Sequence, residues 1–173
     1  MIYLVRHGET DWNLFRRCNG VTETFLNKMG IEQANLQAEN LKDIKFDVCF
    51  CSPQIRARQF CEILFDGSVI FDERLAEMLC GEFEGMEETP EMMKAFWQAI
   101  QTGEKGTENF RIFIKRNCDV CEIIDKNYKG KNVLIITHAA NTRVIDFYFK
   151  GKPKDYNFTN SVIEKGGLIT YKN

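Results

Sequence analysis

The amino-acid sequence predicts an α/β domain whose central sheet is largely parallel and whose helices cover both faces. Short apolar stretches alternate along the chain with longer segments of helical periodicity, and this alternation is typical of α/β folds. The strongest strand pattern, NVLIIT (132–137), is apolar almost throughout, as expected for a strand buried on both faces. With 173 residues, of which 44% are hydrophobic, the chain can form a sizeable core, so we expect one domain over residues 1–173.

The first half of the chain is expected to hold three strands and two helices. The strands are short, apolar segments next to turn-forming residues, at 2–5, 46–52 and 68–71. Residues 10–20 are predicted as loop. Residues 30–42 are predicted as a helix, because apolar residues form a broad helical face there. Ser52-Pro53 is a start signal for a second helix that runs to about Leu64.

The second half is expected to hold three helices and the remaining strands. Helical periodicity and start signals predict these helices at 90–101, 108–127 and 141–149. The strand at 132–137 lies between the last two of them. The tail contains two β-prone segments, 161–164 and 168–172, around Gly166-Gly167, and we expect them to form a closing hairpin that is at least partly antiparallel.

Composition and charge argue against several classes of function. The net charge is −2, with 23 basic and 25 acidic residues interspersed, so we expect no general nucleic-acid or anionic-membrane surface. No stretch approaches the ~20 consecutive apolar residues that span a bilayer, and no signal-peptide pattern is present, so we expect a cytoplasmic protein. In that compartment the seven cysteines are expected to be free thiols that mostly act as small buried hydrophobes.

The two histidines of the chain each follow a predicted strand. His7 comes just after the first strand, and His138 just after the strand at 132–137. Reactive groups collect beyond the carboxyl ends of strands in open α/β sheets, so these side chains can converge although most of the chain separates them. The alternative, that each is a structural histidine, stays open. A metal is not expected, because structural zinc needs four ligands and Arg6 beside His7 would repel a cation.

Two arginines indicate that such a site would bind an anion. The planar guanidinium of Arg6 offers bidentate hydrogen bonds to a phosphate or a carboxylate. Arg56 lies in the first turn of the helix predicted after Ser52-Pro53, whose N-terminal amides also favour an anion. Arg58 faces elsewhere on that helix and is expected at the surface.

Longer motifs carry a resemblance to a known family. They are R-H-G-E-T-D-W-N (6–13), R-x-N-G (17–20), F-L-N-K-M-G-I-E-Q-A (25–34), C-S-P-Q-I-R-A-R-Q (51–59), R-L-A-E (74–77), G-E-F-E-G (81–85), G-T-E-N (106–109), V-L-I-I-T-H-A-A (133–140) and T-N-S-V (159–162). These blocks resemble the histidine phosphatase superfamily, in the branch that contains cofactor-dependent phosphoglycerate mutase. They fall in the family's order and cover nearly the whole chain. One departure is T-H-A-A in place of the commoner T-H-G-G, which puts Ala139 where glycine would leave the backbone free.

The resemblance implies a three-layer α/β/α sandwich of the phosphoglycerate mutase-like type, and a phosphatase that works through a phosphohistidine. It implies that His7 is the nucleophile and that Glu77 is the proton donor to the leaving oxygen. The other implied members of the site are three catalytic, phosphate-binding side chains and two further substrate contacts: Arg6, Arg56 and His138, with Thr10 and Asn13. The expected partner is a small phosphorylated substrate. No metal and no cofactor are expected, and the oligomeric state is left open.

The residue types suit this chemistry. A phosphomonoester is a poor electrophile because its oxygens are negative, so catalysis depends on charge neutralisation and on in-line positioning of the nucleophile. An imidazole nucleophile must be neutral and held in one tautomer, which requires a fixed acceptor such as a backbone carbonyl for its other nitrogen. Glu77 can protonate the leaving alkoxide and then deprotonate the attacking water. Glu82 and Glu84 are expected to be exposed loop carboxylates.

The segment at about 83–107 is expected to form a short cap insertion. Its apolar residues are expected to pack in the core or, alternatively, to form an apolar lip toward the substrate: Met86, Met92, Met93, Phe96 and Trp97. Mutases of the family carry a longer segment here. A mutase must exclude water from the phosphoenzyme, whereas a phosphatase must admit it, so the short cap favours a phosphatase.

Three other functions remain as alternatives. The first is a cofactor-dependent phosphoglycerate mutase, which would need a bisphosphorylated primer. The second is a phospho-ligand binding module that has lost catalysis. The third, a redox function of Cys118-x-x-Cys121, is disfavoured because the pair lies inside a helical pattern, without the strand-to-helix entry that would expose and activate a thiol.

Overall fold

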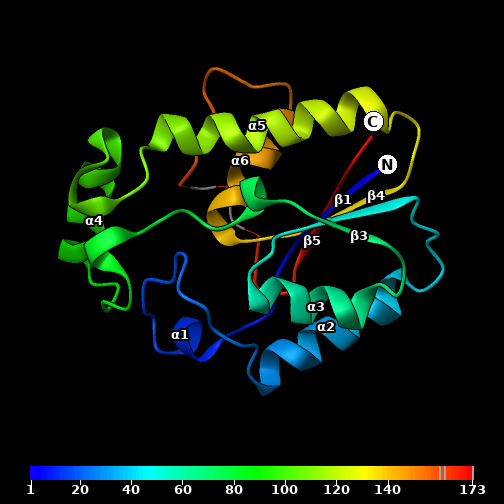
Figure 1. Cartoon of the computed structure of the whole chain (residues 1–173), viewed down its shortest axis with the longest axis horizontal. Coiled ribbons are helices and arrows are strands. Elements are labelled where there is room, and N and C mark those ends of the chain that lie inside the picture. The colour runs from blue at the N-terminus through cyan, green and yellow to red at the C-terminus, as the bar shows by residue number, and fades with distance from the viewer. Residues whose placement is uncertain (160, 162, 173) are drawn as a thin grey trace.

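The computed structural model describes residues 1–159, 161 and 163–172, and its centre is a five-stranded sheet (Figure 1). The strands are β1 (Ile2–Arg6), β2 (Val48–Cys51), β3 (Val69–Phe71), β4 (Val133–Thr137) and β5 (Leu168–Tyr171). Their order is β3-β2-β4-β1-β5, and the neighbouring strands are parallel except for β1 and β5, which are antiparallel. The predicted α/β class with a largely parallel sheet is confirmed.

Helices cover both faces of this sheet. Figure 1 shows α5 (Phe110–Asn127) and α6 (Ala139–Phe149) on one side of the strands, and α2 (Lys28–Leu41) and α3 (Ile55–Leu64) on the other. Toward one end of the sheet lie α1 (Asp11–Leu14) and α4 (Pro90–Thr102). Three single-turn 3-10 helices complete the described elements: η1 (Glu73–Leu75), η2 (Gly81–Phe83) and η3 (Glu104–Gly106). This is the three-layer α/β/α arrangement that the resemblance implies.

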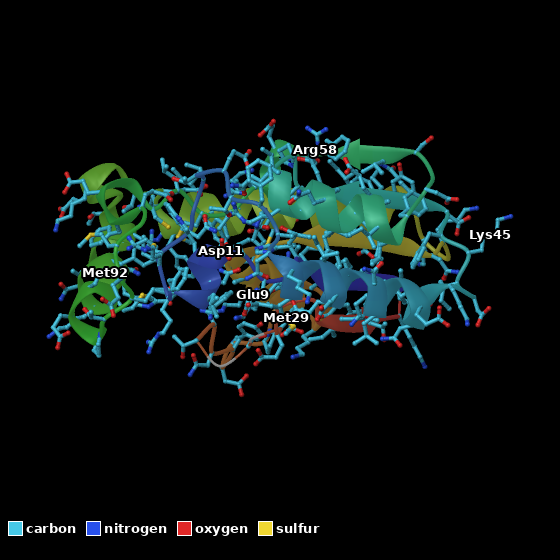
Figure 2. All side chains as sticks on the ribbon, turned by 90° about the horizontal axis from the view of Figure 1, so that it is seen from below. Glu9, Asp11, Met29, Lys45, Arg58 and Met92 are labelled. Atoms are coloured by element: carbon cyan, nitrogen blue, oxygen red, sulfur yellow. The ribbon has the colours of Figure 1, made fainter. Side chains whose placement is uncertain are left out.

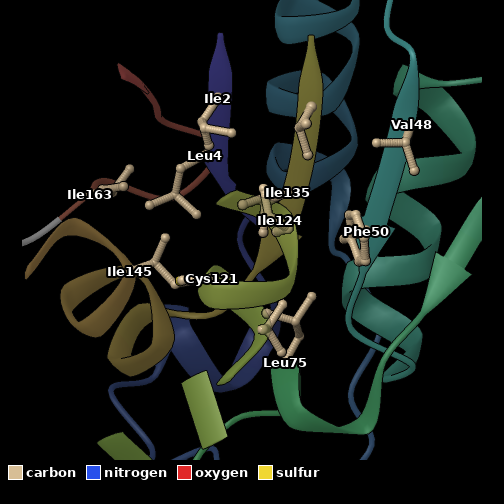
Figure 3. Close-up of a cluster of buried hydrophobic side chains, with 12 residues drawn as sticks. Ile2, Leu4, Val48, Phe50, Leu75, Cys121, Ile124, Ile135, Ile145 and Ile163 are labelled. Atoms are coloured by element: carbon tan, nitrogen blue, oxygen red, sulfur yellow. The ribbon is translucent and has the colours of Figure 1, made fainter. Parts of the chain in front are cut away.

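Alternate residues of each strand enter different layers of the core, because side chains along a strand point to opposite faces. Leu4 and Ile135 pack in one apolar cluster with Ile124 of α5 (Figure 3). The next strand residue, Val5, packs in a second cluster with Phe60 of α3. All five residues of β4 are buried between these two layers, which explains why this strand has the most continuous apolar sequence.

A third apolar cluster joins α4 to the helices beside the sheet. Phe96 and Ile100 of α4 pack there with Phe113 of α5. Figure 2 shows α4 at one end of the elongated molecule, where Met92 lies, and Lys45 at the opposite end. The third cluster therefore holds α4 in place beyond one edge of the central layers.

Several helices begin at residues that differ from the starts predicted by the sequence pattern. The loop predicted at 10–20 contains α1, because the Thr10 side chain accepts a hydrogen bond from the Asn13 backbone N–H and caps a helical turn. α2 begins before Gly30, because Asn27 Oδ1 accepts the Gly30 N–H. α3 begins two residues later than expected, and α6 two residues earlier. Apolar periodicity detects the buried face of a helix, whereas the starts of α1 and α2 depend on a polar N-cap side chain; α3 and α6 begin without such a side-chain hydrogen bond.

The predicted closing hairpin is wrong. β5 pairs with β1, and the described residues of 161–164 belong to no strand, while Val162 lies outside the described residues. Ile163 instead packs into the cluster of Figure 3, and the turn after it is closed by a hydrogen bond from Gly167 N to Glu164 O (2.8 Å). The edge of an existing sheet is a better partner for β5 than an isolated hairpin, which is only marginally stable.

Candidate active site

His7 lies immediately beyond the carboxyl end of β1 and is 3% exposed. Its Nδ1 lies 2.7 Å from the carbonyl oxygen of Gly8. Because a carbonyl oxygen only accepts hydrogen bonds, Nδ1 carries the proton and Nε2 keeps its lone pair in the neutral ring. Burial, followed by the charges of Arg56 and Arg6, lowers the pKa of His7 well below its usual value, so the ring is neutral at physiological pH.

His138 lies beyond β4 as the N-cap residue of α6, and its ring centroid is 5.0 Å from that of His7. β1 and β4 are paired so that Arg6 lies opposite Thr137, and this register brings the two histidines together. His138 Nε2 lies 2.7 Å from Ser52 Oγ, and its buried Nδ1 has no hydrogen-bond partner among the described residues. Burial, and next the charge of Arg56, lowers the pKa of His138 well below its usual value.

Two buried guanidinium groups lie at these histidines. Arg6 Nη1 donates to the carbonyl oxygen of Ile163 (2.9 Å), and Arg56 donates to the carbonyl oxygens of Gly20 (2.7 Å) and Thr22 (3.0 Å). Within the described part of the chain neither arginine forms an ion pair, and both buried Nε–H groups lack an acceptor. Burial lowers the pKa of both groups, because it removes the charged guanidinium from water.

The Glu77 carboxylate is largely buried between two backbone amides. Oε1 accepts from its neighbour Met78 N (2.8 Å) and Oε2 from Ala140 N (3.2 Å) in the first turn of α6. The Glu77 backbone N–H donates to Gln54 Oε1 (2.7 Å), and Arg116 Nη2 donates to the Glu77 carbonyl oxygen (3.2 Å). These contacts hold the carboxylate at the N-terminus of the helix that follows His138.

Thr10 and Asn13 cap each other at α1. Thr10 Oγ1 accepts from Asn13 N (3.2 Å), and Asn13 Oδ1 accepts from Thr10 N (3.1 Å). Asn13 lines the cavity at His7, whereas Thr10 is fully buried and is not among the described residues that line it.

The cavity at His7 has a volume of about 160 Å³. Its charged lining consists of Arg6, Arg17, Glu77, Glu88 and Arg143. Part of its apolar wall comes from α4, through Met93, Phe96 and Trp97. Met92 and Phe96 pack in the third cluster, as the core expectation has it, and Met93, Phe96 and Trp97 line the cavity, whereas Met86 is exposed and does neither.

The sequence analysis missed several residues of this site. Ser52 and Gln54 belong to the same motif as Arg56. Polar side chains just before a helix start are a sequence signal that could have indicated these two residues as members of the site. Arg143, whose buried Nε–H has no acceptor among the described residues, lies on the first turns of α6 after His138. Arg116 gives no such signal, because it contacts the Glu77 segment from α5.

The expectation for Glu84 is wrong. Its carboxylate is not a free loop group, because it accepts hydrogen bonds from Gly20 N (3.1 Å) and Val21 N (2.8 Å). It thereby holds the loop whose Gly20 carbonyl oxygen accepts from Arg56. Glu82 is exposed, as expected.

The Cys118 and Cys121 thiols lack the features of a redox site. All seven cysteines are free; Cys121 is buried in α5 and Cys118 is partly buried there. Burial raises the pKa of both thiols, which makes them poor nucleophiles. In the part of the chain that the structure describes, no group of three or more His, Cys, Asp or Glu residues could hold a metal ion. No described helix has the length and apolar character to cross a membrane.

Comparison with known protein families bears directly on this arrangement of histidines and arginines. The family model of the histidine phosphatase superfamily (branch 1) matches residues 2–164. The chain belongs to this superfamily. Some relatives of this histidine phosphatase are named as phosphatases and others as phosphoglycerate mutases. Solved structures of both kinds share its fold.

One relative is the uncharacterized phosphatase PhoE of Bacillus subtilis, 32% identical over 145 residues that make up 80% of this chain and 72% of that protein. A metal-independent phosphoserine phosphatase of Arabidopsis thaliana is 33% identical over 157 residues, which are 83% of this chain and 66% of the plant protein. A 2,3-bisphosphoglycerate-dependent phosphoglycerate mutase of Rhizobium meliloti is 28% identical over 82% of this chain and 75% of the mutase. The histidine phosphatase relatives thus include both phosphatases and mutases.

Solved structures of other proteins superpose over nearly the whole chain. The α-ribazole phosphatase of Shigella flexneri has a TM-score of 0.83 and 25% identity, covering 96% of this chain and 87% of its own. Bacillus stearothermophilus YhfR has a TM-score of 0.83 and 27% identity, covering 96% of this chain and 88% of its own. The phosphoglycerate mutase-like fold is thereby confirmed.

Proposed function

We propose that this protein is a phosphomonoester phosphatase that acts on a small phosphorylated metabolite through a phosphohistidine at His7. The observation that carries the proposal is the state of the His7 ring. Its Nδ1 proton is held by the Gly8 carbonyl oxygen, its pKa is lowered by burial and by Arg56 and Arg6, and Nε2 is therefore an available nucleophile. The phosphatases among the relatives support the same class of reaction.

The first half of the proposed reaction transfers the phosphoryl group to the enzyme. His7 Nε2 attacks phosphorus, the P–N bond forms, and the bond from phosphorus to the alcohol oxygen breaks. Arg6 and Arg56 neutralise the phosphoryl oxygens. His138 is neutral in the empty pocket, and the arrival of a dianion raises its pKa and favours its protonated, hydrogen-bonding form. Glu77 gives its proton to the departing alkoxide.

The second half returns the enzyme to its starting state. Water attacks phosphorus, Glu77 accepts a proton from that water, and the P–N bond breaks. The products are inorganic phosphate and neutral His7, with Glu77 protonated again. Asn13 and Thr10 complete the proposal as substrate contacts, with Asn13 acting directly from the cavity wall and Thr10 through the capping pair that positions it.

A phosphoglycerate mutase is the second candidate, because mutases are among the relatives. The short cap at about 83–107 supports the phosphatase, since water must reach the phosphoenzyme. A cytoplasmic site of action is part of the proposal, and the seven free thiols support it. Interconversion of 2- and 3-phosphoglycerate that is faster than phosphate release would decide for the mutase.

The direct test is phosphate release from a panel of phosphomonoesters that includes p-nitrophenyl phosphate. Wild-type protein is expected to turn over at least one of them, and His7→Ala is expected to lower kcat by at least ~1,000-fold, because it removes the group on which the proposed covalent intermediate forms. Acid quenching with labelled substrate should trap a phosphoenzyme in the wild type only. Undiminished hydrolysis by His7→Ala would exclude His7 as the nucleophile.

Two arginines on α3 provide a matched pair of variants. Arg56→Ala is expected to lower kcat/KM by about 100- to 1,000-fold, because it removes a buried charge from the phosphoryl oxygens. Arg58→Ala removes an exposed guanidinium that stacks 5.2 Å from the Phe71 ring centroid and should leave kcat/KM within about twofold of the wild type. Equal losses in the two variants would show that net charge, rather than the position of Arg56, matters.

A further inference from the structure

The cavity contains one carboxylate that the proposed reaction does not use. Glu88 lines the cavity together with three arginines, Arg6, Arg17 and Arg143. It is partly buried, and it stands directly before Thr89, the N-cap residue of α4. The α4 helix that supplies part of the apolar wall of the cavity therefore begins two residues after Glu88, at Pro90.

The backbone around Glu88 is fixed on both sides. Its N–H donates to the Arg16 carbonyl oxygen (2.8 Å), and Arg16 Nη2 donates back to the Glu88 carbonyl oxygen (3.3 Å). Thr89 Oγ1 accepts from Met92 N (3.2 Å) and caps the helix that follows. The Glu88 side chain therefore projects from a segment that backbone hydrogen bonds hold in place.

The Glu88 carboxylate has neither a hydrogen bond nor an ion pair with any described residue, although three guanidinium groups share its cavity. Its negative charge nevertheless acts on two of these guanidinium groups, those of Arg6 and Arg143. Burial lowers the pKa of Arg6 and Arg143, and the carboxylates of Glu77 and Glu88 are among the charges that act in the opposite direction. The Glu77 carboxylate accepts hydrogen bonds from the backbone N–H groups of Met78 and Ala140. Among the described residues of this lining, Glu88 is therefore the carboxylate without a hydrogen-bond partner.

We propose that Glu88 is a specificity-determining residue that selects against substrates whose alcohol part carries a second anionic group. The phosphoryl group occupies the end of the cavity at His7, so the alcohol part must extend into the remaining lining, where Glu88 stands. A carboxylate or second phosphate at that position would meet a negative charge, whereas a hydroxyl or an ammonium group would find a hydrogen-bond acceptor. This inference rests on the proposed function and extends it.

The same charge bears on the balance between phosphatase and mutase. A mutase must bind a bisphosphorylated primer, and Glu88 would repel the phosphate that is not being transferred. Without that repulsion, Arg17 and Arg143 would be free to attract it. Glu88 therefore favours release of phosphate over transfer to a second anionic acceptor.

The test compares two phosphomonoesters of equal size, 3-phosphoglycerate and glycerol 3-phosphate, which differ by a carboxylate in place of a hydroxymethyl group. Glu88→Gln keeps the shape and removes the charge, and it is expected to raise the ratio of kcat/KM values, 3-phosphoglycerate over glycerol 3-phosphate, by about three- to tenfold. The increase should shrink at high salt, because charges near solvent are screened.

The matched control is Glu87→Gln. Glu87 is the exposed neighbour of Glu88, is not among the described residues that line the cavity, and undergoes the same change of charge. Its ratio should stay within about 1.5-fold of the wild type, since an exposed charge outside the cavity is screened. An unchanged ratio in Glu88→Gln, or an equal change in both variants, would overturn the inference.

Binding measurements separate this inference from the proposed function. Calorimetry with the two compounds can be done in a His7→Ala background, where turnover is not needed, with and without Glu88→Gln. A shift of the Kd ratio toward 3-phosphoglycerate supports the role of Glu88 even if the wild type releases no phosphate, an outcome that would refute only the proposed function. The absence of a shift rejects the role of Glu88 whatever the turnover.

Discussion

At the scale of single residues, His7 and His138 are buried against each other with guanidinium groups nearby. Burial and next the charge of Arg56 lower the pKa of both imidazoles well below 6.5. In the unfolded chain each imidazole takes up a proton below that value, so the unfolded state binds more protons there than the folded state. The folded state consequently loses about 1.4 kcal/mol per histidine for each pH unit below 6.5, until the lowered pKa of the folded state is reached.

The variant His7→Asn removes one of these groups and tests this linkage. Between pH 7 and pH 5 the free energy of unfolding of the wild type should fall by about 2 kcal/mol more than that of the variant. Urea unfolding at both pH values measures the difference, and the carboxylates that titrate in this range are common to the two proteins. Equal decreases would mean that His7 is already protonated in the folded wild type.

At the scale of secondary-structure elements, the segment that carries His7 rests on α2 through two glycines. A Cβ atom at Gly8 would lie 2.5 Å from the Gly30 carbonyl oxygen, and one at Gly30 would lie 2.2 Å from the Glu9 carbonyl oxygen. Both distances are far shorter than van der Waals contact. Backbone therefore packs against backbone here, and the position of His7 depends on the absence of these side chains.

The variant Gly30→Ala tests this contact. Alanine is favoured over glycine in a helix by about 1 kcal/mol, so a substitution without a clash would stabilise the protein. We expect instead a loss of about 1–3 kcal/mol, because the Glu9 backbone must move, and a fall in kcat because His7 moves with it. Urea unfolding and phosphate release measure the two effects. A more stable variant would show that the contact relaxes without cost.

At the scale of the whole molecule, Asp146 ties the C-terminal part of the chain to α6. Its buried carboxylate accepts hydrogen bonds from the hydroxyls of Tyr156 (2.7 Å), Ser161 (2.6 Å) and Tyr171 (2.6 Å), and from Lys150 Nζ (2.8 Å). The same tail leads to Ile163, whose carbonyl oxygen accepts from Arg6. One buried carboxylate thus connects the last strand, the tail and, through Ile163, the side chain of Arg6.

Asp146→Ala is expected to lower the free energy of unfolding by about 3 kcal/mol, because it removes the acceptor of the Ser161 and Tyr171 hydroxyls and one of the two acceptors near the Tyr156 hydroxyl. Phosphate release should also fall, since Arg6 is no longer held against the tail. The comparison is Lys150→Ala, which removes only a half-exposed ion-pair partner and should cost less than about 1 kcal/mol. Urea unfolding measures the free energy of unfolding of both variants. Equal losses of this free energy would assign the effect to the ion pair rather than to the hydroxyl hydrogen bonds.

Sequence patterns predict best those elements whose own residues reveal them, without knowledge of the elements they pack against. The strand at 132–137 and the helix at 108–127 are visible because burial imposes a pattern on the sequence itself. α1 is not visible in this way, because it depends on one reciprocal pair of caps at Thr10 and Asn13. β5 was predicted as a strand, but its partner was not, since pairing with β1 joins the two ends of the chain.

The sequence by itself determined that this protein is an α/β histidine phosphatase with a histidine after each of two strands and arginines beside them. Local motifs and periodicity are enough for that, because they record which residues a strand end or a helix start requires. Only the tertiary structure decided which acceptor holds the His7 proton, that Ser52 contacts His138, and that Glu88 lies in the cavity. These depend on atoms brought together from distant segments, and no short stretch of sequence contains that information.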